Sequence, residues 1–464
     1  MNEHDSEQLA GLLVAEGMVA TDDVEAADVV VLNTCCIREN ADNKFYGHLG
    51  ALKSLRADRP EVRIAVGGCL AQLEGERIRE RAGHVDVVFG THNLTRAPEL
   101  LRQAATGPVV EIVSAPGPAT PAGGAAAAPA PPVDGADRPS PALTAERDVP
   151  YAAWVTIQTG CDNSCAFCIV PAVRGPEASR PFGELVDEVR VLAGRGVTEV
   201  TLLGQNVNSY GRDLTRRRPL FADLLRAVGD VEGIRRVRFT SPHPKDLRPE
   251  TIAAMAETPA VCNHLHLPLQ SGSDAVLAAM RRGYTASRYL ARLGDARDAV
   301  PDLAVTTDVI VGFPGETEQQ FEETLQVVAD AGFDSAYTFV FSPRPGTRAA
   351  AMDDRFVPPD VVADRFERLR AVVERSALAR HRDRIGRVEE VLVEGPSRRD
   401  PGRFTGRTAQ NKLVHFEPPA SGAPAPGAYA TVRVTGAAPH HLVGEHLATL
   451  SPPRHRTRIP VAGA

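Results

Sequence analysis

Three cysteines lie close together in the middle of the sequence. Cys161, Cys165 and Cys168 follow a short apolar run that predicts a β-strand, and their spacing is CxxxCxxC. A tight triplet of this kind points to metal or redox chemistry, because cysteine thiolates hold iron–sulfur clusters and zinc. A structural zinc site takes four ligands, usually as two pairs, and no partner pair lies near the triplet.

Three thiolates leave one iron of a [4Fe–4S] cluster without a protein ligand. That iron can chelate the amino and carboxylate groups of S-adenosylmethionine (SAM), and an electron from the cluster then cleaves the sulfonium to a 5′-deoxyadenosyl radical. The spacing, with the aromatic Phe167 before the last cysteine, resembles the radical-SAM signature. We therefore interpret Cys161, Cys165 and Cys168 as catalytic metal ligands; a zinc knuckle or three unrelated cysteines are the alternatives.

Two further cysteines, Cys35 and Cys69, each follow a predicted strand in the N-terminal part of the chain. Two cysteines so far apart are weak evidence by themselves, and buried or unpaired thiols are the alternative. Their matching position past two strand ends favours a metal role, because open α/β sheets bind ligands at that edge.

The other cysteines and several histidines have ordinary explanations. Cys262 precedes a core strand and is expected to be a small buried hydrophobe. Cys36 directly follows a presumed ligand, and we do not expect it to bind iron. His243, His264 and His266 lie in or after predicted strands and are expected to be core or loop histidines rather than ligands.

Alternating helices and strands must position these residues. In residues 1–106, strands at 28–32, 62–66 and 85–89 alternate with helices, which predicts a doubly wound α/β domain with a parallel sheet. Residues 114–148 are rich in Pro, Ala and Gly and predict a flexible linker.

Six strand-like runs follow, separated by helical segments that include 182–193 and 316–331, and they predict a partial (βα)6 TIM-like barrel. The six runs are 152–158, 198–203, 235–241, 264–269, 305–311 and 335–341. The loops after these strands are expected to face one cavity. From strand-end position alone we expect SAM contacts at Gln205, Ser241 and Gln270, together with Phe167.

A helix over 359–384 and four strands between 388 and 449 complete the fold and predict a small C-terminal β-barrel. This part contains a polar segment, 406–412, in which Arg407, Asn411 and Lys412 are candidate RNA contacts. A solvated turn is the alternative. Residues 452–464 form a basic tail that we expect to be disordered.

The composition limits the possible functions. The chain has 464 residues, 43% of them hydrophobic, which suffices for several packed domains. A net charge of -7 gives no support to nucleic-acid binding by the whole chain, although a local basic face is compatible with it. No run of about 18 apolar residues exists and the N-terminus has no signal-peptide pattern, so the sequence predicts a cytoplasmic protein without a membrane partner.

The chain resembles the MiaB-type tRNA methylthiotransferases, which make 2-methylthio-N6-dimethylallyladenosine. The resemblance covers nearly all of the chain except the linker and tail. It is carried by residues 33–41 (NTCCIRENA), 67–72 (GGCLAQ), 160–171 (GCDNSCAFCIVP), 174–175, 179–181, 203–211, 241–244, 267–273, 280–284, 311–317 and 341–347. The amino-acid sequences of segments 38–41 and 205–208 favour the dimethylallyladenosine branch of this family. The sister branches modify threonylcarbamoyl-adenosine or a ribosomal-protein aspartate.

The resemblance implies three domains: an auxiliary-cluster domain (1–113), a radical-SAM core (149–384) and a TRAM RNA-binding domain (385–451). It implies two [4Fe–4S] clusters, one on Cys161, Cys165 and Cys168 that cleaves SAM, and an auxiliary one that includes Cys35 and Cys69 and carries the sulfur. One SAM gives the methyl group, and a second gives the radical that removes the C2 hydrogen of adenosine 37, a bond too strong for acid–base attack. We also expect an electron donor such as flavodoxin and a sulfur donor that the sequence does not identify. The protein is expected to be a monomer.

The N-terminus departs from this family. The family's first auxiliary cysteine lies in a Tyr-Gly-Cys-Gln-Met-Asn segment shortly before an Asp-Ser, whereas this chain begins just after that cysteine, with Met1 four residues before Asp5-Ser6. We expect the upstream in-frame DNA to encode a strand ending in Gly-Cys-Gln; a stop codon there would contradict this. A chain beginning at Met1 is expected to have a labile auxiliary cluster and to cleave SAM without inserting sulfur; about eight irons per chain would refute that.

Two alternatives remain beside the main interpretation. One is a sister methylthiotransferase with another substrate, which mass spectrometry of tRNA nucleosides from a deletion strain would distinguish. The other is a non-catalytic RNA-binding or zinc protein of the same fold, which would be colourless and loaded with zinc.

Overall fold

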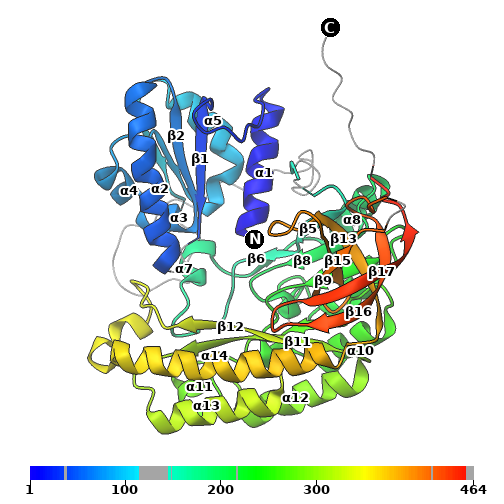
Figure 1. Ribbon diagram of the computed structural model, residues 1–464. Helices are drawn as coiled ribbons and strands as arrows, with labels where there is room; N and C mark the ends of the chain where they lie inside the picture. Colours follow the sequence, from blue (N-terminus) through cyan, green and yellow to red (C-terminus); the bar gives the residue numbers. More distant parts are fainter. Residues whose placement is uncertain (36–38, 114–144, 148, 216–217, 420–421, 456–464) are drawn as a thin grey trace. The chain divides into compact units, whose positions relative to one another are not determined.

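The computed structural model describes residues 1–35, 39–113, 145–147, 149–215, 218–419 and 422–455 (Figure 1). Cys36, most of the predicted linker and most of the predicted tail lie outside the described residues. The chain divides into two compact units. Unit 1 is Met1–Asp148, Gln158–Ser164 and Cys168–Ala178, and unit 2 is Val149–Ile157, Cys165–Phe167 and Ser179–Ala464.

A parallel sheet with the strand order β1-β2-β3-β4 forms the centre of unit 1. Its strands are β1 (Val29–Thr34), β2 (Arg63–Gly68), β3 (Val87–Phe89) and β4 (Val109–Glu111). The first three confirm the predicted strands. The sequence does not predict β4, because three residues are too few for a recognisable period-two pattern.

Helices cover both faces of this sheet, which confirms the doubly wound arrangement (Figure 1). On one face Ala65 and Phe89 pack against helices α1 (Asn2–Ala15) and α5 (Ala97–Gln103). On the other face Ile64 and Val66 pack within an apolar cluster that includes helix residues. The helices on this side are α2 (Glu39–Asp58), α3 (Cys69–Glu74), α4 (Glu76–Arg81) and the short α7 (Val170–Arg174), and the 3-10 helix η1 (Thr91–Arg96) precedes α5.

The core of unit 2 contains the six predicted barrel strands, all in parallel pairs. They form two three-stranded sheets, β5-β8-β9 and β10-β11-β12. The strands are β5 (Ala152–Thr156), β8 (Glu199–Leu203), β9 (Arg236–Phe239), β10 (His264–His266), β11 (Ala304–Val311) and β12 (Ser335–Val340). A single bridge, Val237 to Val261, connects the first sheet to the segment before β10. A two-residue pair, β6 (Gln158–Thr159) with β7 (Ala178–Ser179), lies outside both sheets.

Helices follow the strands of unit 2 as the alternating pattern predicts. They are α8 (Phe182–Gly194), α9 (Phe221–Gly229), α10 (Pro249–Glu257), α11 (Asp274–Ala279), α12 (Ala286–Ala299), α13 (Glu318–Ala331) and α14 (Pro359–Arg382). A capping box of Thr317 and Gln320 starts α13, and Gly332 ends it in the left-handed conformation. The capping box makes Thr317 the N-cap, so the helix begins at Glu318, two residues later than predicted.

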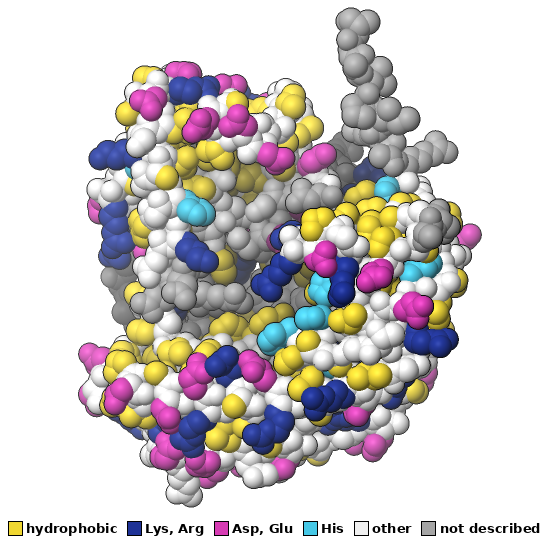
Figure 2. Space-filling view, in the orientation of Figure 1, with side chains coloured by type: hydrophobic (Ala, Val, Ile, Leu, Met, Phe, Trp, Pro, Cys, Tyr) yellow, Lys and Arg dark blue, Asp and Glu magenta, His cyan; other side chains and the backbone are white. Residues whose placement is uncertain are grey.

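The long helix α14 separates an apolar stripe from a charged outer face. Val362, Leu369 and Val373 are buried, and Phe366 on the same stripe is partly buried. Figure 2 shows acidic and basic side chains interspersed along the lower part of the molecule. On α14, Arg368 bonds to Glu318 at 2.6 Å. The outer face of α14 is therefore a solvated surface.

The C-terminal part of unit 2 is a closed barrel with the strand order β13-β14-β15-β17-β16. Its strands are β13 (Val388–Pro396), β14 (Phe404–Thr408), β15 (Leu413–Glu417), β16 (Tyr429–Ala437) and β17 (Leu442–Ser451). The small β-barrel is confirmed, with one strand, β14, that the sequence does not predict because Gly406 and two threonines hide its apolar alternation. Among the residues that the structure describes, no helix has the length and apolar character needed to cross a membrane.

Candidate functional site

A glycine turn directs the cysteine loop out of β6. Gly160 has a φ of 75°, and a Cβ there would collide with the backbone of Pro176. The Cys161 amide donates to the Gly175 carbonyl at 3.1 Å, and Asp162 accepts from the Glu177 amide at 2.9 Å. The start of the loop is therefore fixed by backbone geometry that only glycine permits.

The three cysteines of the loop differ in exposure. Cys161 is buried, whereas Cys165 and Cys168 are partly exposed. The Asn163 side chain donates to the Cys161 sulfur at 3.4 Å. Within the described ranges, no three Cys, His, Asp or Glu side chains lie close enough to hold one metal ion. The assignment of the three cysteines as ligands of one cluster stays a prediction.

A buried guanidinium in unit 2 contacts one of these thiols. Arg282 donates to the Cys165 sulfur at 3.3 Å and to the Tyr284 hydroxyl at 3.2 Å, and its side chain is almost fully buried. Neither residue is expected at the site from the sequence, although both lie in segment 280–284, which carries part of the family resemblance. A thiolate, or a negatively charged cluster that it binds, fits beside this cation.

Two of the expected SAM contacts lie in strained backbone at strand ends. Ser241 follows β9 with a φ of 61°, and Gln270 follows β10 with a φ of 69°. Non-glycine residues rarely adopt this region, and such strain concentrates at functional sites. Within the described part of unit 2, the buried Gln270 Oε1 has no hydrogen-bond partner, so it fits a polar ligand.

His243, which follows β9, has a second buried polar atom without a described partner, and the loop after β8 holds this histidine in place. Asn208 donates to the His243 carbonyl at 3.0 Å and accepts from the His243 amide at 2.9 Å. Burial, with Arg282 and Lys245 nearby, lowers the pKa of His243 to about 2, so its ring is neutral. Its Nε2 is buried and has no partner among the described residues. Gln205, which lies with Asn208 on the loop after β8, is partly buried.

Phe167 has mainly a packing role in the structure. Its ring joins an apolar cluster in unit 2 that includes Val276, Met280 and Phe313. The Ala166 amide beside it donates to the Met280 carbonyl at 2.9 Å. The middle of the cysteine loop is thereby anchored to α11, and a contact of Phe167 with SAM stays a prediction.

The two N-terminal cysteines occupy matching positions in unit 1. Thr34, the last residue of β1, pairs with Gly68, the last residue of β2, and Cys35 and Cys69 follow directly. Gly68 has a φ of 94°, and a Cβ there would collide with the Thr34 backbone. The expected placement at adjacent strand ends is therefore present.

The helix that follows the triplet contributes a charged residue to Cys69, also within unit 1. Arg174, at the end of α7, forms a buried ion pair with Asp5 and a hydrogen bond with the Cys69 sulfur. Burial by itself lowers the pKa of Arg174, but Asp5 and Cys69 more than offset it and raise the pKa. Thr91 donates to the Val173 carbonyl at 2.6 Å and fixes α7 in place.

A cavity of about 660 Å³ opens at the end of β1 in unit 1. Leu9 and Leu13 of α1 form part of its apolar wall, and Asn33, Cys35 and Lys44 supply polar groups. The carboxyl edge of a parallel sheet is the usual ligand position in this architecture.

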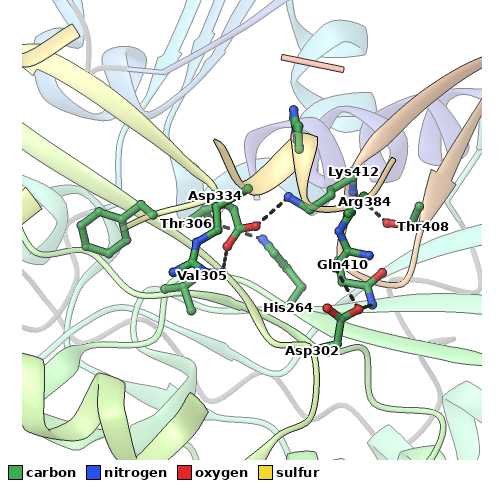
Figure 3. Close-up of polar contacts among 12 residues, drawn as sticks. His264, Asp302, Val305, Thr306, Asp334, Arg384, Thr408, Gln410 and Lys412 are labelled. Atoms are coloured by element: carbon green, nitrogen blue, oxygen red, sulfur yellow. Dashed lines mark hydrogen bonds and ion pairs between the residues drawn. The ribbon is translucent and has the colours of Figure 1, made fainter. Parts of the chain in front are cut away.

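The predicted RNA-contact residues lie in β14 and in the turn between β14 and β15 in unit 2, and Figure 3 shows one of them, Lys412. Arg407 is in β14 rather than in a turn, and its Nε donates to Glu394 at 2.8 Å. Asn411 has a φ of 63° and forms part of the turn itself. Around this turn, Arg236 donates to the Arg407 carbonyl at 2.6 Å and Arg238 to the Thr408 carbonyl at 2.8 Å.

Lys412 is buried, which differs from the exposed phosphate contact that the sequence predicts. Its ammonium donates to Asp334, before β12, at 2.6 Å, and Gln410 donates to Asp302, before β11, at 2.8 Å (Figure 3). Burial lowers the pKa of Lys412, against the effect of Asp334. The turn therefore anchors the small barrel to the amino ends of the core strands, and an RNA contact by Lys412 would require this ion pair to open.

Family models match three parts of the chain. The Radical SAM superfamily matches residues 155–328, the TRAM domain matches 382–447, and the uncharacterized protein family UPF0004 matches 1–90. The barrel, with its cysteine loop, thus defines a radical SAM protein, and this class implies a [4Fe–4S] cluster and SAM as cofactors.

Curated relatives identify the family. The chain is 50% identical over 464 residues to tRNA-2-methylthio-N(6)-dimethylallyladenosine synthase 1 of Mycobacterium marinum, covering 96% of this chain and 84% of the relative. It is 53% identical to the synthase of Acidothermus cellulolyticus, covering 96% and 86%, and 49% identical to that of Thermobifida fusca, covering 96% and 87%. The chain belongs to the family of tRNA-2-methylthio-N(6)-dimethylallyladenosine synthases.

A solved structure agrees at the level of fold. The radical SAM methyltransferase TsrM from Kitasatospora setae, solved with a tryptophan substrate and a SAM analogue, has a TM-score of 0.53. It is 14% identical, and the match covers 75% of this chain and 72% of that one.

Proposed function

We propose that this chain is a radical-SAM methylthiotransferase that adds a methylthio group to C2 of N6-dimethylallyladenosine at position 37 of tRNA. The observation that carries the proposal is the CxxxCxxC loop that follows the first strands of a radical-SAM domain, in a chain half identical to synthases named for this product. The small C-terminal barrel, which matches a TRAM domain, supports tRNA as the partner.

Cys161, Cys165 and Cys168 are the proposed ligands of the SAM-cleaving [4Fe–4S] cluster. When bound, this cluster supplies the electron that cleaves SAM. Ser241 and Gln270, with Gln205 and Phe167, are proposed to hold SAM, and the unpartnered Gln270 oxygen supports this role. Three thiols are a donor set that fits such a cluster, and the Arg282 guanidinium beside the Cys165 sulfur fits its negative charge.

Cys35 and Cys69 are the proposed ligands of a second, auxiliary [4Fe–4S] cluster. Their adjacent strand-end positions, the Arg174 contact and the cavity at the end of β1 support a metal site there. The reaction needs a sulfur atom beside the target carbon, and an auxiliary cluster is the proposed carrier.

The remaining assignments complete the proposal. Arg407 and Asn411 are proposed RNA contacts, flavodoxin or a similar protein is the electron donor, and the enzyme is a cytoplasmic monomer. The domains are the auxiliary-cluster domain at 1–113, the radical-SAM core at 149–384 and the TRAM domain at 385–451.

Nucleoside mass spectrometry of tRNA from a deletion strain tests the substrate. The methylthio group on dimethylallyladenosine should disappear and return with the plasmid-borne gene, but not with a Cys168→Ala version. Loss of methylthio from threonylcarbamoyl-adenosine, or from a ribosomal protein, would instead assign a sister activity. A colourless, zinc-loaded protein with unchanged nucleosides would remove the enzymatic proposal.

A further inference from the structure

Arg282 occupies an unusual position for a charged side chain. Only 6% of its surface is exposed, and its described contacts are the Cys165 sulfur at 3.3 Å and the Tyr284 hydroxyl at 3.2 Å. Tyr284 is itself fixed, because its hydroxyl lies within hydrogen-bond distance of the Pro268 and Leu269 carbonyls, at 3.1 and 2.8 Å. The guanidinium is thus held against the thiol by a buried tyrosine.

The charge of Arg282 has no carboxylate partner. None of the ion pairs found among the described residues of unit 2 includes this side chain, whereas the equally buried Arg365 and Arg384 each pair with carboxylates. A guanidinium does not lose its proton in proteins, and burying it without an anion is strongly unfavourable. The Arg282 guanidinium contacts the sulfur of Cys165, so a negatively charged cluster bound to that sulfur would offset its charge.

We propose that Arg282 is a positioning residue that supplies the positive charge for the SAM-cleaving cluster through Cys165, and so raises the reduction potential of that cluster. This inference rests on the proposed function, in which Cys165 is a cluster ligand. Net charge and hydrogen bonds to sulfur set the potential of an iron–sulfur cluster. Arg282 donates directly to the sulfur of Cys165, so its charge acts on the cluster through this ligand.

The effect has a defined sign. Reduction of the cluster from the 2+ to the 1+ state adds one electron, taken from a reductant such as dithionite, and makes the site more negative. A fixed cation beside a ligand sulfur stabilises the reduced state more than the oxidised state. Removing the cation should lower the ratio of reduced to oxidised cluster at a fixed potential by about tenfold, which is about 59 mV for a one-electron couple.

Three variants of the full-length, anaerobically reconstituted protein test this proposal. Arg282→Met removes the charge and keeps the length, Arg282→Lys keeps the charge, and Arg281→Met is the matched control because Arg281 is the exposed neighbour. Iron content is measured first, and the reduced cluster is then followed by EPR during a dithionite-based redox titration. A signal that changes shape when SAM is added identifies the SAM-cleaving cluster.

The expected result is a tenfold lower reduced-to-oxidised ratio in Arg282→Met, a change below about threefold in Arg282→Lys, and none in Arg281→Met. If Arg282→Met loses its iron, Arg282→Gln replaces it, since glutamine keeps a donor without the charge. An unchanged ratio in the neutral variants, or an equal shift in Arg282→Lys, would overturn the role of charge. A wild-type protein without any SAM-responsive signal would instead overturn the proposed function, and the inference with it.

Discussion

One buried arginine contacts a cysteine at each proposed cluster position. Arg282 donates to Cys165 in unit 2, and Arg174 hydrogen-bonds to Cys69 in unit 1. A permanent cation beside a ligand sulfur would offset the negative charge of a cluster bound there. The two contacts differ in one respect, since Arg174 also pairs with Asp5 whereas Arg282 has no carboxylate.

Replacing one ligand of the triplet should abolish SAM cleavage. We expect Cys168→Ala to reduce formation of 5′-deoxyadenosine by at least about 1,000-fold, because the cluster supplies chemistry that no side chain replaces. Iron per chain should fall by about half, since one of two proposed clusters is lost. Cys262→Ala is the control, because Cys262 is a buried thiol whose pKa burial raises. Iron loss in the control, or retained cleavage in Cys168→Ala, would contradict the assignment.

Gln270→Leu should weaken SAM binding without unfolding the barrel. The buried Gln270 oxygen lacks a partner within the described residues, so leucine removes only a hydrogen bond to the ligand. A hydrogen bond to a charged group contributes about 1.5–3 kcal/mol, so the Kd for SAM should rise about tenfold or more. Equilibrium binding measures this, with the exposed Gln326→Leu as the matched control. Equal affinities for both variants would exclude the contact.

At the scale of elements, the regular strands and helices were predictable, and the side-chain contacts between distant segments were not. The valine-rich β11 and the caps of α13 carry clear local signals. β4 and β14 lack them, because one is three residues long and the other contains Gly406. Cys161 to Cys168 could be found from spacing alone, but Arg282 could not, since 117 residues separate it from Cys165.

The turn between β14 and β15 is a second case in which contacts between distant segments could not be predicted from the sequence. Sequence favours Lys412 as an RNA contact because it is a lysine in a polar segment, yet its burial depends on Asp334, 78 residues away. Tertiary pairing therefore decides what a charged residue does, and the local sequence does not encode it. The anchoring of this turn makes the small barrel and the core strands one compact unit.

Lys412→Met should destabilise the protein more than it weakens RNA binding. The substitution leaves Asp334 buried without its partner, and breaking a buried ion pair costs about 3–5 kcal/mol. Thermal unfolding of the reconstituted protein should show a lower midpoint, and the salt dependence of tRNA affinity should stay the same. Arg407→Met is the comparison, since Arg407 is a partly exposed proposed RNA contact. An unchanged midpoint with a shallower salt dependence in Lys412→Met would assign the lysine to RNA instead.

At the scale of the whole molecule, buried and partly buried histidines make the stability of unit 2 sensitive to acid. Burial is the main cause that lowers the pKa of His243 to about 2, of His264 to about 3 and of His381 to about 4. In the unfolded chain a histidine titrates near 6.5. Below that pH the unfolded state binds protons that the folded state does not, so stability is fully present above about pH 6.5 and is lost as the pH falls.

His264→Gln should make the protein less sensitive to acid. Each of these histidines contributes about 1.4 kcal/mol of lost stability per pH unit between about pH 6 and its folded pKa. Arg238 and His266 face His264 and oppose its protonation, while Thr306 accepts or donates a hydrogen bond that glutamine can keep. Thermal midpoints at pH 7, 6 and 5 should therefore fall less steeply in His264→Gln than in wild type. The exposed His440→Gln should follow wild type, and because all three proteins keep the same cysteines, acid damage to the clusters affects them equally. Parallel curves for His264→Gln and wild type would mean that His264 takes up its proton in the folded state.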